Sequence, residues 1–153
     1  MINRTLISLL ILFTVFSCKK KPVENINPPI AKEPVITLES VTPTTVHQFT
    51  DSIVFNVKFI DGDGDLGDFS ADSLSLALID NRSAALEERF HIAPAAPVNV
   101  TVAVQGVYHI VLDHTIFLNS ASTSESTTFT VHLKDRAGHW SNVVNSGTIT
   151  ILP

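Results

Sequence analysis

The sequence predicts an all-β fold, an antiparallel β-sandwich of seven or eight strands that spans residues 35–153. Two observations predict it. Apolar residues recur at every second position rather than at the 3.6-residue period of a helix. The alternating stretches are short and are separated by loops rich in turn-forming residues, a pattern typical of sandwiches. Only residues 84–89 have the composition of a helical turn, and they are too few for a helix. A length of 119 residues suits one domain with one core.

The first 17 residues have the layout of a secretory signal peptide. Arg4 supplies a positive start, residues 6–16 are mainly apolar, and the small Ser17 precedes Cys18, the single cysteine of the chain. The run is shorter than the roughly 20 residues that cross a bilayer, which disfavours a transmembrane helix. A signal peptide cleaved at another bond is the remaining alternative.

The residues around Cys18 resemble the lipobox of bacterial lipoproteins, although the bulky Phe16 replaces a smaller residue. In that class the cysteine is acylated and becomes the mature N-terminus. The resemblance implies palmitate-type lipid on Cys18, a membrane as partner and a location in the bacterial cell envelope. Leaflet and side stay open.

Residues 18–34 read as the tether between the lipid and the folded domain. Four prolines recur among Lys, Glu and Asn, and few side chains there could be buried. Such a segment is extended and semi-rigid. We therefore expect residues 19–34 to lack regular structure.

The strands are expected where the period of two is clearest, and a tight hairpin turn is expected at Gln105-Gly106. The predicted strands are 35–39, 52–60, 74–79, 88–92, 98–104, 108–112, 128–133 and 149–151. Residues 119–128 are rich in Ser and Thr and are expected to form a solvated loop. The predicted core comprises Phe55, Val57, Phe59, Leu76, Leu78, Ile110, Leu112, Phe129, Val131 and Ile149.

The segment from Asp135 to Ser141 reads D-R-A-G-H-W-S. It resembles the "D-x-A-G-x-x-S" turn between the last two strands of immunoglobulin-like domains on bacterial surface proteins. The resemblance implies an immunoglobulin-like sandwich over 35–153, without the cysteine pair of antibody domains. Trp140 is expected to pack over one end of that sandwich, with stacking on a sugar as the alternative.

Acidic residues concentrate in the sequence D-G-D-G-D-L-G-D at residues 61–68, and Asp72 follows four residues later. Alternating carboxylates, with glycines that permit sharp turns, suit a hard cation that takes six to eight oxygen ligands. Helix-flanked calcium loops differ, because here Leu66 replaces the required glycine and strands flank the loop. A similar "DGDGDLG" occurs in uncharacterised bacterial lipoproteins, which implies membership of such a family.

The sequence therefore predicts one calcium ion, with ligands from the acidic loop and from the turn before Trp140. The immunoglobulin-like topology would place that turn at the same end of the domain. An exported domain without disulfides would also gain from a metal that holds its loops. The alternative is a hydrated Asp-Gly turn that binds nothing. The candidate ligands are Asp61, Asp63, Asp65, a fourth acid from Asp68 or Asp72, and Asp135.

Charge and motifs exclude several function classes. From residue 35 onward the sequence contains five Lys and Arg and 13 Asp and Glu, which gives a formal charge of −8. Such a negative charge disfavours nucleic acid as a partner. There is no G-x-S-x-G, no H-E-x-x-H and no phosphate-binding glycine loop. The six histidines show no metal-ligand spacing. A glycosidase-like carboxylate pair is the remaining catalytic alternative. Because the acids of this small sandwich gather in one loop, we expect no enzyme activity.

Two functions from different classes remain. The first is a non-catalytic, calcium-stabilised module on a lipid anchor, with a structural or interaction role. The second is an accessory protein that binds a glycan or another ligand, with Trp140 and Tyr108 as stacking surfaces. A contiguous exposed aromatic platform would favour the second, and a lone Trp packed at the metal end would favour the first.

Overall fold

A computed structural model of the chain describes residues 31–153. The predicted signal peptide, Cys18 and the tether up to residue 30 lie outside the described residues. Residues 31–34 have no regular structure. In the described part of the chain, no helix is long and apolar enough to cross a membrane.

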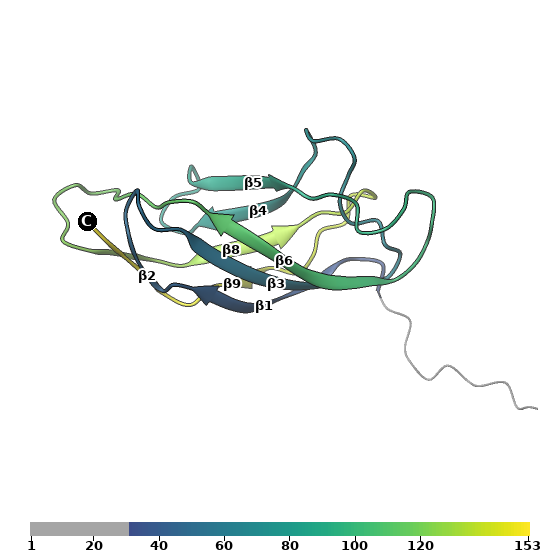
Figure 1. Cartoon of the computed structure of the whole chain (residues 1–153), viewed down its shortest axis with the longest axis horizontal. Coiled ribbons are helices and arrows are strands. Elements are labelled where there is room, and N and C mark those ends of the chain that lie inside the picture. Colours follow the sequence, from purple (N-terminus) through teal and green to yellow (C-terminus); the bar gives the residue numbers. More distant parts are fainter. Residues whose placement is uncertain (1–30) are drawn as a thin grey trace, which may run out of the picture.

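The fold is an all-β sandwich, as predicted (Figure 1). The strands within residues 31–153 are β1 (Val35–Thr42), β2 (Thr45–His47), β3 (Ile53–Asp61), β4 (Leu74–Asp80), β5 (Glu87–His91), β6 (Val104–Leu112), β7 (Glu125–Thr127), β8 (Phe129–Leu133), β9 (Val144–Asn145) and β10 (Ile149–Leu152). The specifically immunoglobulin-like topology stays a prediction.

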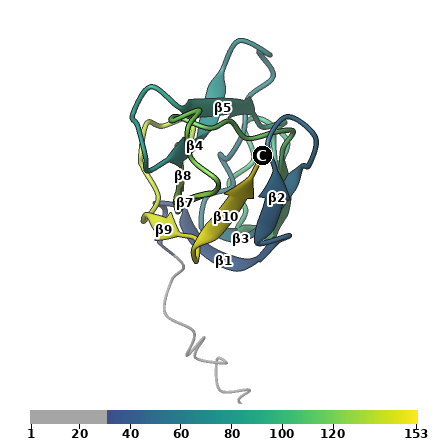
Figure 2. The same cartoon turned by 90° about the vertical axis from the view of Figure 1, so that its left-hand side faces the viewer.

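Three sheets enclose one core (Figure 2). Their strand orders are β1-β3-β6, β5-β4-β8-β9 and β2-β10-β7. Among the described strands every pairing is antiparallel except that between β2 and β10. The longest pairing aligns β3 with β6 from Ile53–Leu112 to Asp61–Val104, which fixes which side chains of both strands face inward.

The core matches the predicted set closely. Nine of the ten predicted residues are buried, and Leu112 is partly buried against them. Val46 and Ile151 complete the core from the short third sheet, where both are fully buried. The alternation along β3, with odd-numbered positions buried, shows why the period of two identified the inward face.

Ten strands replace the seven or eight predicted, because three additional strands have only two or three residues each. These are β2, β7 and β9. Such lengths are too short to show a period. β7 also places regular structure inside the predicted Ser/Thr-rich loop.

The predicted strand 98–104 is wrong up to residue 103, which has no regular structure. Its valines alternate, but Val98, Val100 and Val102 are exposed. The Val102 N–H donates to the carbonyl of Asp63, so this segment packs on the acidic loop instead of pairing in a sheet.

The predicted hairpin at Gln105-Gly106 is also wrong, because both residues lie inside β6. Gly106 pairs with Phe59 of β3, and a Cβ on Gly106 would lie 2.9 Å from the Phe59 ring. The glycine makes room for an aromatic ring rather than for a turn.

The two ends of the sandwich are built differently. At the right-hand end of Figure 1, β3 leads into the acidic loop and β8 leads into the 134–140 loop. The described chain also begins there, and the Gly62 N–H donates to the carbonyl of Ala31 at 3.0 Å. The C-terminus lies at the left-hand end.

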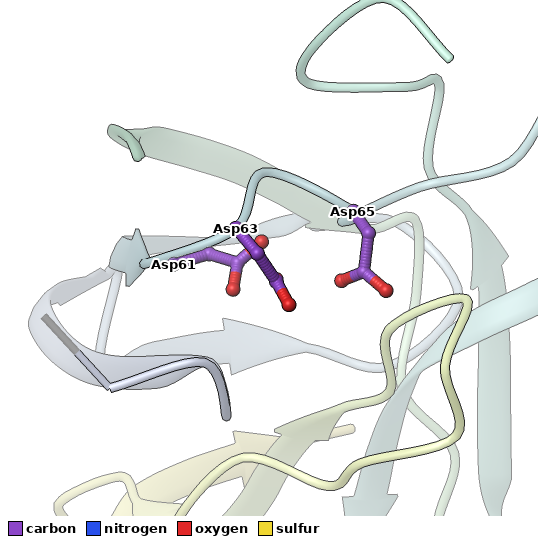
Figure 3. A group of neighbouring side chains, drawn as sticks. All are labelled: Asp61, Asp63 and Asp65. Carbon is purple, nitrogen blue, oxygen red and sulfur yellow. The ribbon is translucent and has the colours of Figure 1, made fainter. Parts of the chain in front are cut away.

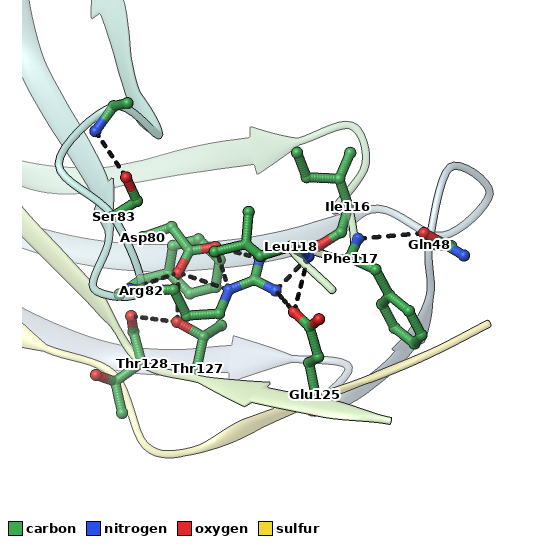
Figure 4. Close-up of polar contacts among 12 residues, drawn as sticks. Gln48, Asp80, Arg82, Ser83, Ile116, Phe117, Leu118, Glu125, Thr127 and Thr128 are labelled. Carbon is green, nitrogen blue, oxygen red and sulfur yellow. Dashed lines mark hydrogen bonds and ion pairs between the residues drawn. The ribbon is translucent and has the colours of Figure 1, made fainter. Parts of the chain in front are cut away.

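The opposite end is held by a buried ion-pair network (Figure 4). Arg82 contacts Asp80 and Glu125, each at 2.5 Å, and its guanidinium donates to the carbonyl of Ile116. Thr127 donates a further hydrogen bond to Asp80. The side chains of the three charged residues are 12% exposed or less, so all three charges are paired away from water.

Candidate metal centre

The acidic loop turns sharply at two glycines. Gly64 and Gly67 have φ angles of 74° and 76°, in the left-handed region that other residues rarely adopt. A Cβ on Gly64 would overlap the carbonyl oxygen of Val102, and one on Gly67 would overlap that of Ala93. Both glycines therefore let the loop pack against the 92–103 segment while its aspartates turn inward.

Asp61, Asp63 and Asp65 form one cluster (Figure 3). Each offers a carboxylate oxygen, and these oxygens lie within 4.8 Å of one another. Figure 3 shows the three side chains projecting from a single stretch of chain into a common space. This is the arrangement that the alternation of Asp and Gly predicted.

Asp61 is the deepest member of the cluster, with no exposed surface. Neither of its carboxylate oxygens has a hydrogen-bond partner among the described residues, and one buried oxygen each of Asp63 and Asp65 is also without one. The N–H groups of Asp65 and Leu66 face Asp61 without reaching hydrogen-bonding geometry. Buried carboxylates in proteins are normally paired or coordinate a metal, because an uncompensated buried charge is costly.

The electrostatics agree with the geometry. Burial raises the pKa of Asp61 above 3.8, and the charges of Asp63 and Asp65 raise it further. Burial also raises the pKa of Asp65, followed by the charges of Asp135 and Asp63. Without a cation the cluster therefore resists being fully ionised.

Asp135 is not one of the three clustered residues, but its charge raises the pKa of Asp65 and its own side chain has no exposed surface. It accepts hydrogen bonds from the backbone N–H and the imidazole of His139, at 2.7 and 2.8 Å. The 134–140 loop reaches Asp65 directly, because the Ala137 N–H donates to its carboxylate and the Arg136 N–H to its carbonyl. Asp65 thus connects the two loops.

The structure does not bring Asp68 and Asp72 into the cluster. Asp68 accepts a hydrogen bond from the Ser70 N–H, which leads the causes that lower its pKa. Asp72 is exposed. The side chain of Asn142 is committed to β1, because it makes two hydrogen bonds with the backbone of Ile36, at 2.8 and 2.9 Å.

Tyr108 is a residue of the site that sequence reasoning missed. Its ring stacks on Phe59 at 4.4 Å, and its hydroxyl is buried without a hydrogen-bond partner in the described chain. Burial, followed by the charge of Asp61, raises its pKa to about 12. The period of two along β6 indicates that Tyr108 faces inward with Ile110, but it does not indicate that the hydroxyl lies near Asp61.

The two predicted stacking residues do not form one aromatic platform. Tyr108 packs inside the sandwich, whereas Trp140 is 45% exposed and stacks on the His132 ring at 4.5 Å. Lys134 lies over the Trp140 ring, with its Nζ 5.6 Å from the centroid. Trp140 therefore packs as a single exposed aromatic residue in the 134–140 loop, at the same end of the domain as the acidic loop.

The ligand atoms that the cluster offers are carboxylate oxygens, which defines its chemistry. Three carboxylates converge there, with the buried carboxylate of Asp135 beside them. Such a set can hold a hard divalent cation. Comparison with protein-family models, with curated proteins and with solved structures finds no match for this chain.

Proposed function

We propose that this protein is a non-catalytic, calcium-stabilised β-sandwich module, anchored to a bacterial membrane through lipid on Cys18, with a structural or interaction role. The observation that supports the metal is the buried carboxylate of Asp61. Both of its oxygens are unpaired and lie beside Asp63 and Asp65. A divalent cation would compensate the three converging charges.

Calcium fits the cluster better than magnesium. Calcium accepts six to eight oxygen ligands in irregular shells, whereas magnesium demands a near-ideal octahedron and gives up its water reluctantly. The cluster stands on a loop that turns at two glycines. Asp135 is better placed than Asp68 or Asp72 to supply a fourth carboxylate, because it is buried and its charge reaches Asp65.

Thermal melting of the full chain in detergent, with calcium and after its removal, tests the metal. Binding to the folded state alone would stabilise it by about 2.7 kcal/mol at a hundredfold excess over the dissociation constant. We expect Asp63→Ala to remove most of the calcium effect and to leave the metal-free melting temperature unchanged or slightly raised, because it also removes repulsion.

Asp72→Ala is the matched control, since it removes an exposed acid of the same loop region outside the cluster. It should keep the full calcium effect. If calcium leaves the wild-type melt unchanged and calorimetry detects no binding at millimolar calcium, the acidic loop is only a charged turn.

The anchor is proposed from the sequence around Cys18 alone. Metabolic labelling with a palmitate analogue should mark the wild-type protein and not Cys18→Ser, which should also be released or left unprocessed. Label that persists in the serine variant would rule out Cys18 as the acylation site.

A further inference from the structure

A groove opens on the sheet surface beside the metal end, between the start of β4 and the 134–140 loop. Its volume is about 340 Å³. Ser75 and Arg89 line it from β4 and β5, and Lys134, Arg136 and Trp140 line it from the loop. It lies outside the acidic cluster, although Asp135 forms part of its lining.

The groove gathers positive charge on an acidic domain. Residues 31–153 hold six Lys and Arg, and three of them line this one groove. Of the others, Arg82 is committed to the buried network at the opposite end. The three basic side chains exceed the two acids of the lining, Asp68 and Asp135.

Two of these cations can meet a ligand. Within residues 31–153 no carboxylate lies within ion-pairing distance of Lys134. Arg89 pairs only with Glu87, and its side chain stays 48% exposed. Arg136 has a different role, because its guanidinium donates to the carbonyls of Leu66 and Gly67 and so holds the loop in place.

A buried hydroxyl also lines the groove. The Oγ atom of Ser75 is buried and has no hydrogen-bond partner among the described residues. Such a group is usually satisfied by a ligand or by water. Trp140 adds an apolar surface, since its indole ring is nearly half exposed and is fixed against His132.

A cation pair, an unpaired hydroxyl and a fixed indole together match a sugar that carries a carboxylate. The carboxylate would pair with the cations, a ring hydroxyl would satisfy Ser75, and the ring would contact Trp140. An acidic peptide would use the cations but would leave the serine and the indole without a specific role. The arrangement therefore favours the saccharide.

We propose that this groove binds an acidic oligosaccharide through Lys134, Arg89 and Ser75. The inference rests on the proposed metal site in one respect: Asp65 and Arg136 tie the 134–140 loop to the acidic loop. A bound cation would therefore hold Lys134 and Trp140 in position.

Calorimetry on the full chain in detergent, with millimolar calcium, tests the groove. The probe is a hyaluronan octasaccharide, which carries glucuronate, and the comparison is a neutral N-acetylglucosamine oligosaccharide. We expect the acidic sugar to bind at least about tenfold more tightly, and Lys134→Gln to weaken that binding about tenfold. Ser75→Ala should weaken binding without lowering the melting temperature. Lys58→Gln removes an exposed lysine of the other sheet and should change nothing.

Three outcomes would contradict the proposed sugar site. The neutral sugar could bind as tightly as the acidic one, or Lys58→Gln could weaken binding as much as Lys134→Gln. A glutamate-rich peptide of the same charge could also bind more tightly than the sugar. Calcium melts separate the two proposals. If calcium raises the melting temperature but no sugar binds, the proposed sugar site is wrong and the proposed metal site stands. If the acidic sugar binds with the expected pattern among the variants but calcium does not change the melting temperature, the proposed sugar site stands and the proposed metal site is wrong.

Discussion

Tyr108 is the only tyrosine of the chain, and its hydroxyl lies buried within the field of Asp61. Its pKa is about 12, raised by burial and then by the Asp61 charge. A cation held by Asp61 would cancel the second cause, because it neutralises the nearby carboxylate. We therefore expect calcium to lower the pKa of Tyr108, as measured by ultraviolet absorbance of the tyrosinate during alkaline titration.

The variant Asp63→Ala provides the control for that titration. It keeps Tyr108 and Asp61 but loses a ligand of the proposed site, so calcium should no longer shift the absorbance curve. A calcium shift of equal size in both proteins would mean that the ion acts elsewhere.

The backbone conformation at Gly67 leads to a prediction about stability. Its φ of 76° and its contact with the Ala93 carbonyl leave no room for a side chain. Gly67→Ala should lower the free energy of unfolding by at least about 1 kcal/mol. Gly147→Ala is the matched control, because a Cβ there meets nothing within 4 Å. Chemical denaturation of both variants measures the difference, and equal stabilities would contradict the strained turn.

Among the elements, β4 and β7 are joined by Arg82 at the end opposite the acidic cluster. Replacing Arg82 by methionine would leave Asp80 buried without its cation, which costs of the order of 3 kcal/mol. Arg89→Met breaks a pair whose arginine is 48% exposed and should cost at most about 1 kcal/mol. Urea denaturation of the two variants should separate them clearly, and similar midpoints would show that the network adds little.

The strands show how far a sequence predicts elements and where it stops. The stretch 52–60 was identified because β3 buries every second residue against one core. The stretch 98–104 has the same alternation, yet residues up to 103 form no strand because Val102 bonds to Asp63 instead of to a sheet neighbour. The alternation shows only which residues are apolar. A strand also needs a neighbouring strand to pair with, and the tertiary structure determines whether one is available.

The site was predictable to the same degree. Spacing alone placed Asp61, Asp63 and Asp65 together, because Asp-Gly alternation turns carboxylates to one side. Asp68 lies three residues after Asp65 and so falls outside that alternation. Its carboxylate accepts a hydrogen bond from the Ser70 N–H, after the chain has turned at Gly67. Tyr108 could not be assigned to the site, because its distance in sequence from the loop gives no sign that its hydroxyl lies near Asp61.

For the whole molecule, the raised pKa values of Asp61 and Asp65 give the metal-free protein a characteristic response to pH. A carboxyl whose pKa is higher in the folded state stabilises the fold below its ordinary value of 3.8. That contribution is lost as the pH rises through the folded-state pKa. A bound cation would favour the ionised carboxylates and remove this loss.

The calcium-induced rise in melting temperature should therefore grow as the pH is raised from about 4 toward neutrality. Comparing calcium-loaded with metal-free protein at each pH cancels the other groups, including Asp80, whose lowered pKa has the opposite effect. Differential scanning calorimetry would measure the gap. A gap that shrinks with rising pH would contradict the assignment of Asp61 and Asp65 as ligands.

The described chain begins at the end that carries the acidic loop and finishes at the other end, so a pull between Ala31 and Pro153 runs along the strands (Figure 1). The register of β1 on β3, from Val35–Ile60 to Thr42–Val54, then bears the load in shear, with its hydrogen bonds resisting together rather than opening one by one. Asn142 reinforces β1 at Ile36. Forced unfolding is governed by a rate rather than by an equilibrium. A pull on the first strand is thus resisted by the whole β1–β3 ladder, and the acidic cluster of Asp61, Asp63 and Asp65 lies beside the end where such a force would enter.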